Sequence, residues 1–221
     1  CRLCTSASLT AMNKTDRRRV SGPLIWAALL IAVAVPITAA AFSPLLAWRE
    51  PIYIIAGFAG ILGMELLLFQ PILAGGYIPE LSTRSHRRLH RWVGSTLVLA
   101  VVVHVGGLWI TSPPDVLDAL LFRSATSFSV WGVIAMWAVF GAALFALTLR
   151  RLRLKWWVWR LGHTSLAAIT VVGTIIHVLL IEGTMEPVTK VLLCILVFAA
   201  VGKVLINLRV WTTQTRRKLK S

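Results

Sequence analysis

The stretch HRWVGSTLVLAVVVH, from His90 to His104, has a histidine at each end of an apolar run long enough to enter a membrane. A second stretch, HTSLAAITVVGTIIH, from His163 to His177, has the same length and the same two ends. The chain has only five histidines, and these two stretches contain four of them. Ionisable residues are rare within membrane spans and usually functional, so the repeated spacing indicates a shared role.

The composition is that of an integral membrane protein. Of the 221 residues, 57% are hydrophobic and only 14% are charged, whereas soluble domains are about half apolar and about a quarter charged. A membrane-spanning helix needs about 20 apolar residues, and none of the long apolar segments alternates with the period of two that a barrel strand requires. We therefore predict an all-α integral membrane bundle of six transmembrane helices. The expected spans are Pro23–Trp48, Pro51–Ala74, Trp92–Thr111, Phe128–Leu149, Leu161–Ile181 and Val188–Leu208.

The formal net charge of +15 follows the pattern of membrane topology. Basic residues cluster in the N-terminal tail, in the second and fourth predicted loops and in the C-terminal tail, while the other loops contain few. By the positive-inside rule, both termini then lie in the cytoplasm of a multi-pass protein of the cell (inner) membrane. We expect lipid, and no nucleic acid, as the surrounding partner. The expected parts are a cytoplasmic N-terminal tail (1–22), a six-helix transmembrane domain (23–211) and a basic cytoplasmic C-terminal tail (212–221).

The third and fifth predicted spans run in the same direction, and each presents two histidines on one face. Fourteen residues of α-helix rise about 21 Å and make almost four full turns. If the two helices lie side by side, His90 faces His163 near the cytoplasmic surface. His104 then faces His177 nearer the outer surface.

Facing imidazoles predict a cofactor. A pair of them is the axial ligation of a six-coordinate haem, and imidazole is a suitable ligand for haem iron. We therefore predict two haem groups between the third and fifth helices, with their irons roughly 20 Å apart. Histidines in spans also act as hydrogen-bonding groups in helix packing or as proton relays. Identical spacing on two parallel spans at matching depths favours haem over packing.

Other polar residues near these stretches are candidates for supporting roles. His86 lies four residues before His90 on the same helical face and competes with it as a ligand. The matched spacing favours His90, and we expect His86 at the surface or beside a haem propionate. Arg91 and Arg160, together with Arg87, lie near the predicted inner haem. They could pair with its propionates or serve only as positive-inside anchors.

Glu65 and a set of glycines leave alternatives open. Glu65, in the second span, could serve a proton path, bond to a haem-linked group, or be neutral and bonded to a neighbouring helix.

The glycines near the histidines fit either a cofactor sandwiched between helices or ordinary close helix packing. These glycines are Gly94, Gly106, Gly107, Gly162 and Gly173.

The chain resembles the ferric-reductase-like transmembrane domain superfamily, which includes NADPH oxidases, ferric reductases and the haem-binding membrane subunit of the bacterial periplasmic methionine sulfoxide reductase system. The resemblance rests on HRWVG followed by His104 on one span, and on WRLGH, residues 159–163, followed by His177 two spans later. It covers roughly residues 23–211. It implies two b-type haems ligated by the pairs His90/His163 and His104/His177, with electron flow from a cytosolic reductant to an outer acceptor.

Larger members of this superfamily carry a C-terminal flavin and nicotinamide module. Here no G-x-G-x-x-G motif follows a strand, because Gly57, Gly60 and Gly63 lie inside a span at the wrong spacing. We therefore expect a separate cytosolic flavoprotein reductase as donor, and ferric iron, oxygen or a periplasmic redox protein as acceptor.

The predicted function is that of a transmembrane di-haem b-type cytochrome. Whether this electron-transfer subunit is an enzyme by itself stays open, and we assign no catalytic residue. One alternative is a quinol-oxidising, b561-like cytochrome. The other is a non-redox membrane transporter whose histidines handle protons or metal.

Overall fold

The computed structural model describes residues 2–152, 155–183 and 185–218, and over those ranges the chain forms helices and no strands. Six of the helices are long and apolar enough to cross a membrane. The prediction of an all-α, multi-pass membrane bundle with six spans is therefore confirmed. The helices are α1 (Arg2–Ala41), α2 (Pro51–Ala74), α3 (Thr83–Thr111), α4 (Pro113–Leu120), α5 (Ser127–Leu152), α6 (Trp156–Leu180) and α7 (Pro187–Lys218), with a short 3-10 turn, η1, at Pro44–Leu46.

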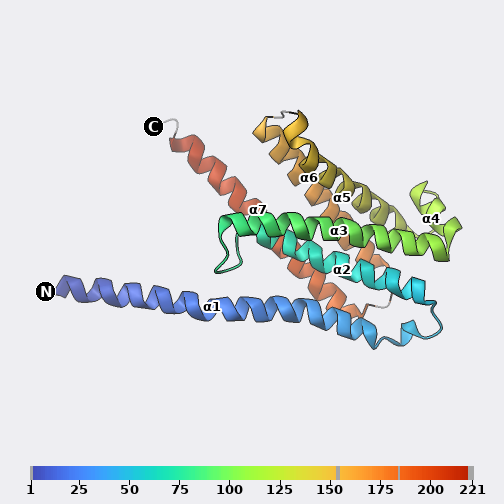
Figure 1. The fold of residues 1–221 in the computed structure, drawn as a ribbon, viewed down its shortest axis with the longest axis horizontal. Helices are drawn as coiled ribbons and strands as arrows, with labels where there is room; N and C mark the ends of the chain where they lie inside the picture. The colour runs from blue at the N-terminus through green and yellow to red at the C-terminus, as the bar shows by residue number, and fades with distance from the viewer. Residues whose placement is uncertain (1, 153–154, 184, 219–221) are drawn as a thin grey trace.

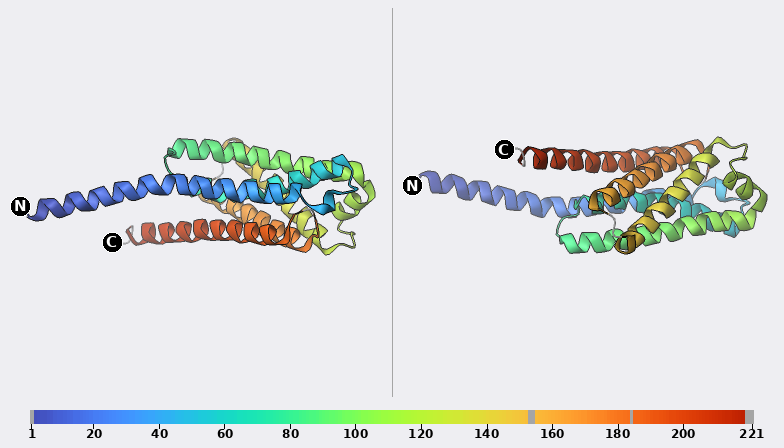
Figure 2. Two further views of the ribbon diagram at one scale, coloured as in Figure 1. Left: turned by 90° about the horizontal axis from the view of Figure 1, so that it is seen from below. Right: turned by 90° about the horizontal axis from the view of Figure 1, so that it is seen from above.

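Two antiparallel helix pairs form the centre of the bundle. Helix α2 lies along α3, and α5 lies along α6, as Figure 1 shows. Helix α7 packs mainly against α2, and α1 runs beside α2 and continues past the bundle toward the N-terminus. Both chain termini lie at the same end, and the short helix α4 lies at the opposite end, which the two views of Figure 2 also show. Helices α3 and α6 consequently run in the same direction.

The ends of the helices follow local sequence signals. Proline stands at the first helical position of α2, α4 and α7, where its missing N–H costs nothing. The Ser82 hydroxyl accepts a hydrogen bond from the backbone N–H of Ser85, at 3.1 Å, and so caps α3. The Glu186 carboxylate does the same for α7 by accepting bonds from the backbone N–H groups of Val188 and Thr189.

Three predicted span boundaries differ clearly from the structure, and one of them is the start of the fifth span, at Trp157 and not at Leu161. The first span ends at Ala41 and not at Trp48, because Ser43 and Pro44 begin the turn η1. Helix α3 begins at Thr83, well before the predicted start at Trp92. The residues from Thr83 to Arg91 are mostly polar but continue the capped helix, so the helix extends beyond the apolar run that defined the predicted span.

The buried core joins the two helix pairs to α7. It contains side chains from α2, α3, α6 and α7, and the residues of α7 within it are almost fully enclosed. The members of the core are Met64, Leu67, Leu68, Leu97, Val171, Leu193, Cys194 and Val197.

Candidate cofactor site

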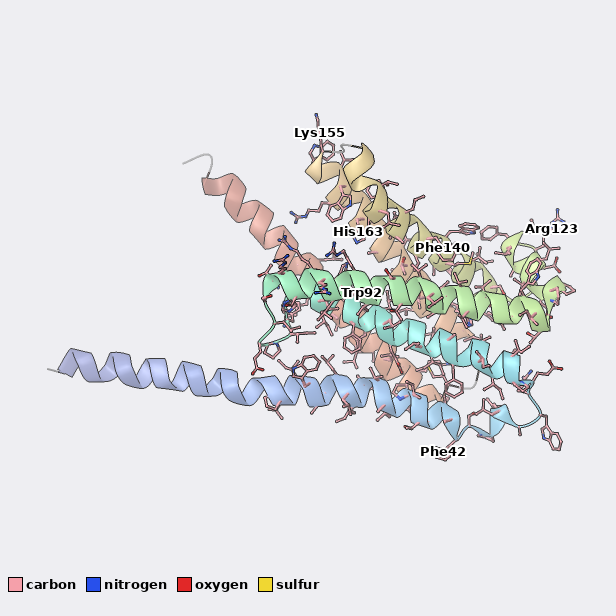
Figure 3. The ribbon with its side chains drawn as sticks, in the orientation of Figure 1. Phe42, Trp92, Arg123, Phe140, Lys155 and His163 are labelled. Carbon is pink, nitrogen blue, oxygen red and sulfur yellow. The ribbon has the colours of Figure 1, made fainter. Side chains whose placement is uncertain are left out.

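His90 and His163 lie opposite each other between α3 and α6. Their ring centroids are 6.4 Å apart and the ring planes make an angle of 71°. Bonds from an imidazole nitrogen to a metal are about 2 Å long, so two rings on opposite sides of one ion have nitrogens about 4 Å apart and centroids roughly 6 Å apart. The observed spacing therefore suits two rings that share one metal ion. Figure 3 labels His163 on α6 and Trp92 on α3 at this level of the bundle.

His104 and His177 form a second pair, fourteen residues further along the same two helices. The two rings are close enough to interact electrostatically. The His177 ring also makes an edge contact with Phe128, with centroids 5.8 Å apart. The chain therefore places His90 opposite His163, and it places His104 near His177 on the same two helices.

Backbone carbonyls hold both rings of the second pair. The Nδ1 of His104 lies 2.7 Å from the carbonyl oxygen of Ala56 on α2. The Nδ1 of His177 lies 2.9 Å from the carbonyl oxygen of Phe128 on α5. A carbonyl can only accept a hydrogen bond, so in each ring Nδ1 carries the proton and donates it. The Nε2 atom then keeps its lone pair and can bind a metal.

The first pair is held less tightly. The Nδ1 of His90 lies 3.2 Å from the carbonyl oxygen of Gln70, and the Gln70 amide donates a 3.4 Å bond back to the His90 carbonyl. The carbonyl of Ala142 lies near the His163 ring, but the buried Nδ1 of that ring makes no hydrogen bond of ordinary geometry with any residue that the structure describes. Instead, His163 stacks flat on Trp159, with centroids 5.4 Å apart and an angle of 5°.

Sequence reasoning missed two glycines at the second pair. A Cβ atom at Gly60 would lie 2.9 Å from the His104 Nδ1, and one at Gly132 would lie 2.7 Å from the His177 Nδ1. Neither glycine stands near a histidine in the sequence, so spacing from the histidines does not reveal them. The one available signal is that they are 72 residues apart, close to the 73 that separate His104 from His177.

The glycines that the sequence did single out mostly serve helix packing. A Cβ at Gly107 would lie 2.8 Å from the Ala56 Cβ, and one at Gly173 would lie 3.1 Å from the Ala135 Cβ. A Cβ at Gly162 would lie 2.7 Å from the Phe145 ring, and one at Gly94 3.4 Å from the Gln70 amide. Only Gly106 of this set has open space beside it. Of the two readings for these glycines, close helix approach fits the four in contact.

Of the two positions expected for His86, at the surface or beside a haem propionate, the surface position is wrong. Its side chain is only 6% exposed, and its Nδ1 donates a 3.0 Å hydrogen bond to the Ser82 carbonyl. The reason is the early start of α3, which places His86 within regular helix on the face that His90 presents to α2. Its Nε2 is buried without a hydrogen-bond partner among the described residues.

The candidate arginines lie at the end of the bundle that holds both termini. Arg91 is exposed and, with Arg88, Trp92 and Ser95, lines a shallow cavity of about 340 Å³ on α3. Arg160 is half-buried on α6, one turn before His163. A further arginine, Arg123, which follows α4, lies at the opposite end of the bundle, as Figure 3 shows.

Glu65 is enclosed in the bundle. Its side chain is 1% exposed, and neither carboxylate oxygen has a hydrogen-bond partner within the described part of the chain. Of the three roles left open for Glu65, a hydrogen bond to a neighbouring helix is therefore not found among the described residues.

The described residues contain no cluster of three or more His, Cys, Asp or Glu side chains that could hold a metal ion. Each histidine pair offers an ion two nitrogens, so any further ligands must come with the ion. A macrocycle that brings four nitrogen ligands of its own would meet that condition.

One comparison with known proteins gives a match. The family model described as "Ferric reductase like transmembrane component" matches residues 56–174, slightly more than half of the chain. The matched region begins at Ala56, whose carbonyl faces His104, and ends just before His177. No curated protein and no solved structure matches the chain.

Proposed function

The chain belongs to the family of ferric reductase-like transmembrane components, and from this premise we propose that it moves electrons across the membrane through two b-type haem groups. His90 and His163 hold one group, and His104 and His177 hold the other. The observation that carries this proposal is the opposed arrangement of His90 and His163, whose centroids are 6.4 Å apart. When bound, haem supplies the one-electron chemistry.

The chain supplies ligand orientation and burial. The backbone bonds from His104 and His177 hold each ring with Nε2 free, and they raise the basicity of the ligand. Passing a proton through such a ring from Nε2 to Nδ1 would require breaking the bond between Nδ1 and the carbonyl. This favours the redox function over a transporter with proton-handling histidines.

We propose that Arg91 and Arg160 pair with the propionates of the haem held by His90 and His163. Both guanidinium groups lie at the same end of the bundle as that pair, and Arg160 is one turn from His163. Guanidinium groups bind carboxylates in a two-pronged geometry that orients them.

The charge pattern supports an orientation for the electron path. The end of the bundle with both termini is rich in arginine and lysine, so we place it in the cytoplasm. A reduced flavoprotein with an acidic surface would dock there with electrostatic help. The acceptor, which is ferric iron, oxygen or a periplasmic redox protein, then meets the end near α4.

Haem content per chain tests the ligand assignment. The purified protein should contain about two haems per chain. His104→Ala and His177→Ala should each lose the same haem, so the double variant should lose no more than either single variant. His86→Ala is the matched control, because His86 lies in the same helix one turn from His90 and should leave both haems bound. A colourless wild-type protein, or equal loss in His86→Ala, would overturn the proposal.

The identity of the electron donor distinguishes this function from that of a quinol-oxidising cytochrome. The haems of the purified protein should be reduced rapidly by a reduced flavoprotein, at a rate that falls as salt screens the basic end. Reduction by a quinol and by no flavoprotein would instead favour the quinol-oxidising cytochrome.

A further inference from the structure

The backbone carbonyls that face the histidines repeat with the histidine spacing. On α2, the carbonyls of Ala56 and Gln70 are fourteen residues apart, and on α5 those of Phe128 and Ala142 have the same separation. Each ligand helix therefore lies against an antiparallel partner that offers one carbonyl per histidine (Figure 1). The pairs α2–α3 and α5–α6 are two versions of the same ligand-holding unit.

A helix carbonyl is normally covered on its outer side. It already accepts the N–H four residues later, and the Cβ of that later residue tilts back toward the helix N-terminus, over the carbonyl. A ring can approach the second lone pair closely only if the later side chain is very small. At the second pair the residues four positions after Ala56 and Phe128 are Gly60 and Gly132.

The short distances to the histidine rings leave no room for a Cβ atom at Gly60 or Gly132. A Cβ at Gly60 would lie 2.9 Å from the His104 Nδ1 and 3.1 Å from its Cε1. At Gly132 the corresponding distances to His177 would be 2.7 Å and 2.9 Å. Carbon atoms do not approach a ring this closely without a shift, so either residue with a methyl group would push the ring away from its carbonyl.

The first pair provides an internal comparison. The residues four positions after Gln70 and Ala142 are Ala74 and Ala146, which carry a Cβ. There the contact of the His90 Nδ1 is longer, at 3.2 Å, and the His163 Nδ1 makes no hydrogen bond of ordinary geometry within the described part of the chain. Within one molecule, glycine four residues after the carbonyl accompanies the short hydrogen bonds of the second pair. Alanine at the same position accompanies the weaker contacts of the first pair.

We infer that Gly60 and Gly132 are positioning residues that expose two helix carbonyls to His104 and His177, making this pair more electron-donating than His90 and His163. This inference rests on the proposed function. A hydrogen bond donated by Nδ1 makes the ring a more basic ligand, and a more basic ligand favours the oxidised metal. The glycines therefore set the two sites of one chain at different redox potentials.

Alanine substitutions with matched controls test this inference. Gly60→Ala and Gly132→Ala should each shift the midpoint potential of one haem to a more positive value and alter its low-spin electron paramagnetic resonance signal. The other haem should be unchanged. Gly63→Ala on α2 and Gly141→Ala on α5 are the controls, because a Cβ there meets only leucine methyl groups at 3.8 Å and 3.5 Å. Unchanged potentials in both test variants, or equal shifts in the controls, would overturn the inference.

The reverse substitution keeps the inference testable if the alanine variants do not fold. Ala146→Gly removes a methyl group and uncovers the Ala142 carbonyl, so the haem held by His163 should shift to a more negative potential. No shift in Ala146→Gly would contradict the positioning role. A wild-type protein without haem would instead defeat the proposed function. Two haems in the wild type, with no response to any of these substitutions, would defeat only this inference.

Discussion

At the scale of single residues, Glu65 is an acidic side chain in an apolar, buried position. It is 1% exposed in the middle of α2, with neither oxygen hydrogen-bonded within the described residues. Leaving a buried polar group without a partner costs about 1–3 kcal/mol. A chain that keeps such a group gives up stability at that position, which is common at functional sites.

Replacing Glu65 with an apolar residue should therefore stabilise the protein. Glu65→Leu should raise the free energy of unfolding in detergent by about 1–3 kcal/mol, because it removes the unpartnered group and keeps the volume similar. Glu65→Gln is the control and should give little gain, since the amide is still polar and buried. Thermal unfolding of the two variants and the wild type makes the comparison. A loss of stability in Glu65→Leu would mean that the carboxyl group has a partner.

At the scale of a single element, Glu186 links the stability of α7 to pH. Its carboxylate accepts hydrogen bonds from the backbone N–H groups of Thr189 and Val188, at 2.7 Å and 3.0 Å. These bonds lower the pKa of Glu186 below its ordinary value of 4.5. A lowered folded-state pKa contributes stability that is present above the unfolded value and is lost as pH falls through the folded value.

The contribution of the two Glu186 hydrogen bonds should appear in the pH dependence of thermal unfolding. Above about pH 5, wild-type protein should unfold at a higher temperature than Glu186→Gln, because only the ionised carboxylate is a strong acceptor at the N-terminus of a helix. The difference should shrink as pH falls below 4.5, as the cap protonates. Scans of both proteins from acidic to neutral pH measure it. A constant difference across that range would show that the charge of Glu186 does not stabilise α7.

At the scale of the whole molecule, six spans place both termini on one side of the membrane. The structure shows both ends of the chain at one end of the bundle and α4 at the other (Figure 2). The basic residues favour the terminal end as the cytoplasmic one. The path proposed for electrons therefore has a direction that can be tested without measuring electron transfer.

Cysteine labelling should report this orientation. In a variant whose three cysteines are replaced by alanine, Arg123→Cys should react with a membrane-impermeant thiol reagent added to intact cells. Lys155→Cys should react only after the membrane is opened, because the two residues are exposed at opposite ends of the bundle (Figure 3). Labelling of Lys155→Cys in intact cells would reverse the orientation and the proposed donor and acceptor sides.

Sequence alone determined the features that depend on local helical periodicity. Apolar length defined six spans, and a fourteen-residue interval placed two histidines on one face of each of two helices, because 3.6 residues make one turn. The family resemblance, carried by the two histidine stretches, is confirmed by the match over residues 56–174. The ligand roles of the histidines and the two haems stay predictions.

Only the tertiary structure decided what lies against each ring. The acceptors are backbone carbonyls, which every residue has, so no residue type marks Ala56 or Phe128 as special. Gly60 and Gly132 matter because a neighbouring helix approaches them closely, and that approach depends on packing far from them in the sequence. The burial of His86 and the burial of Glu65 also follow from the close approach of neighbouring helices. Periodicity orients a side chain on its own helix, whereas the distance to the next helix is a property of the packed bundle.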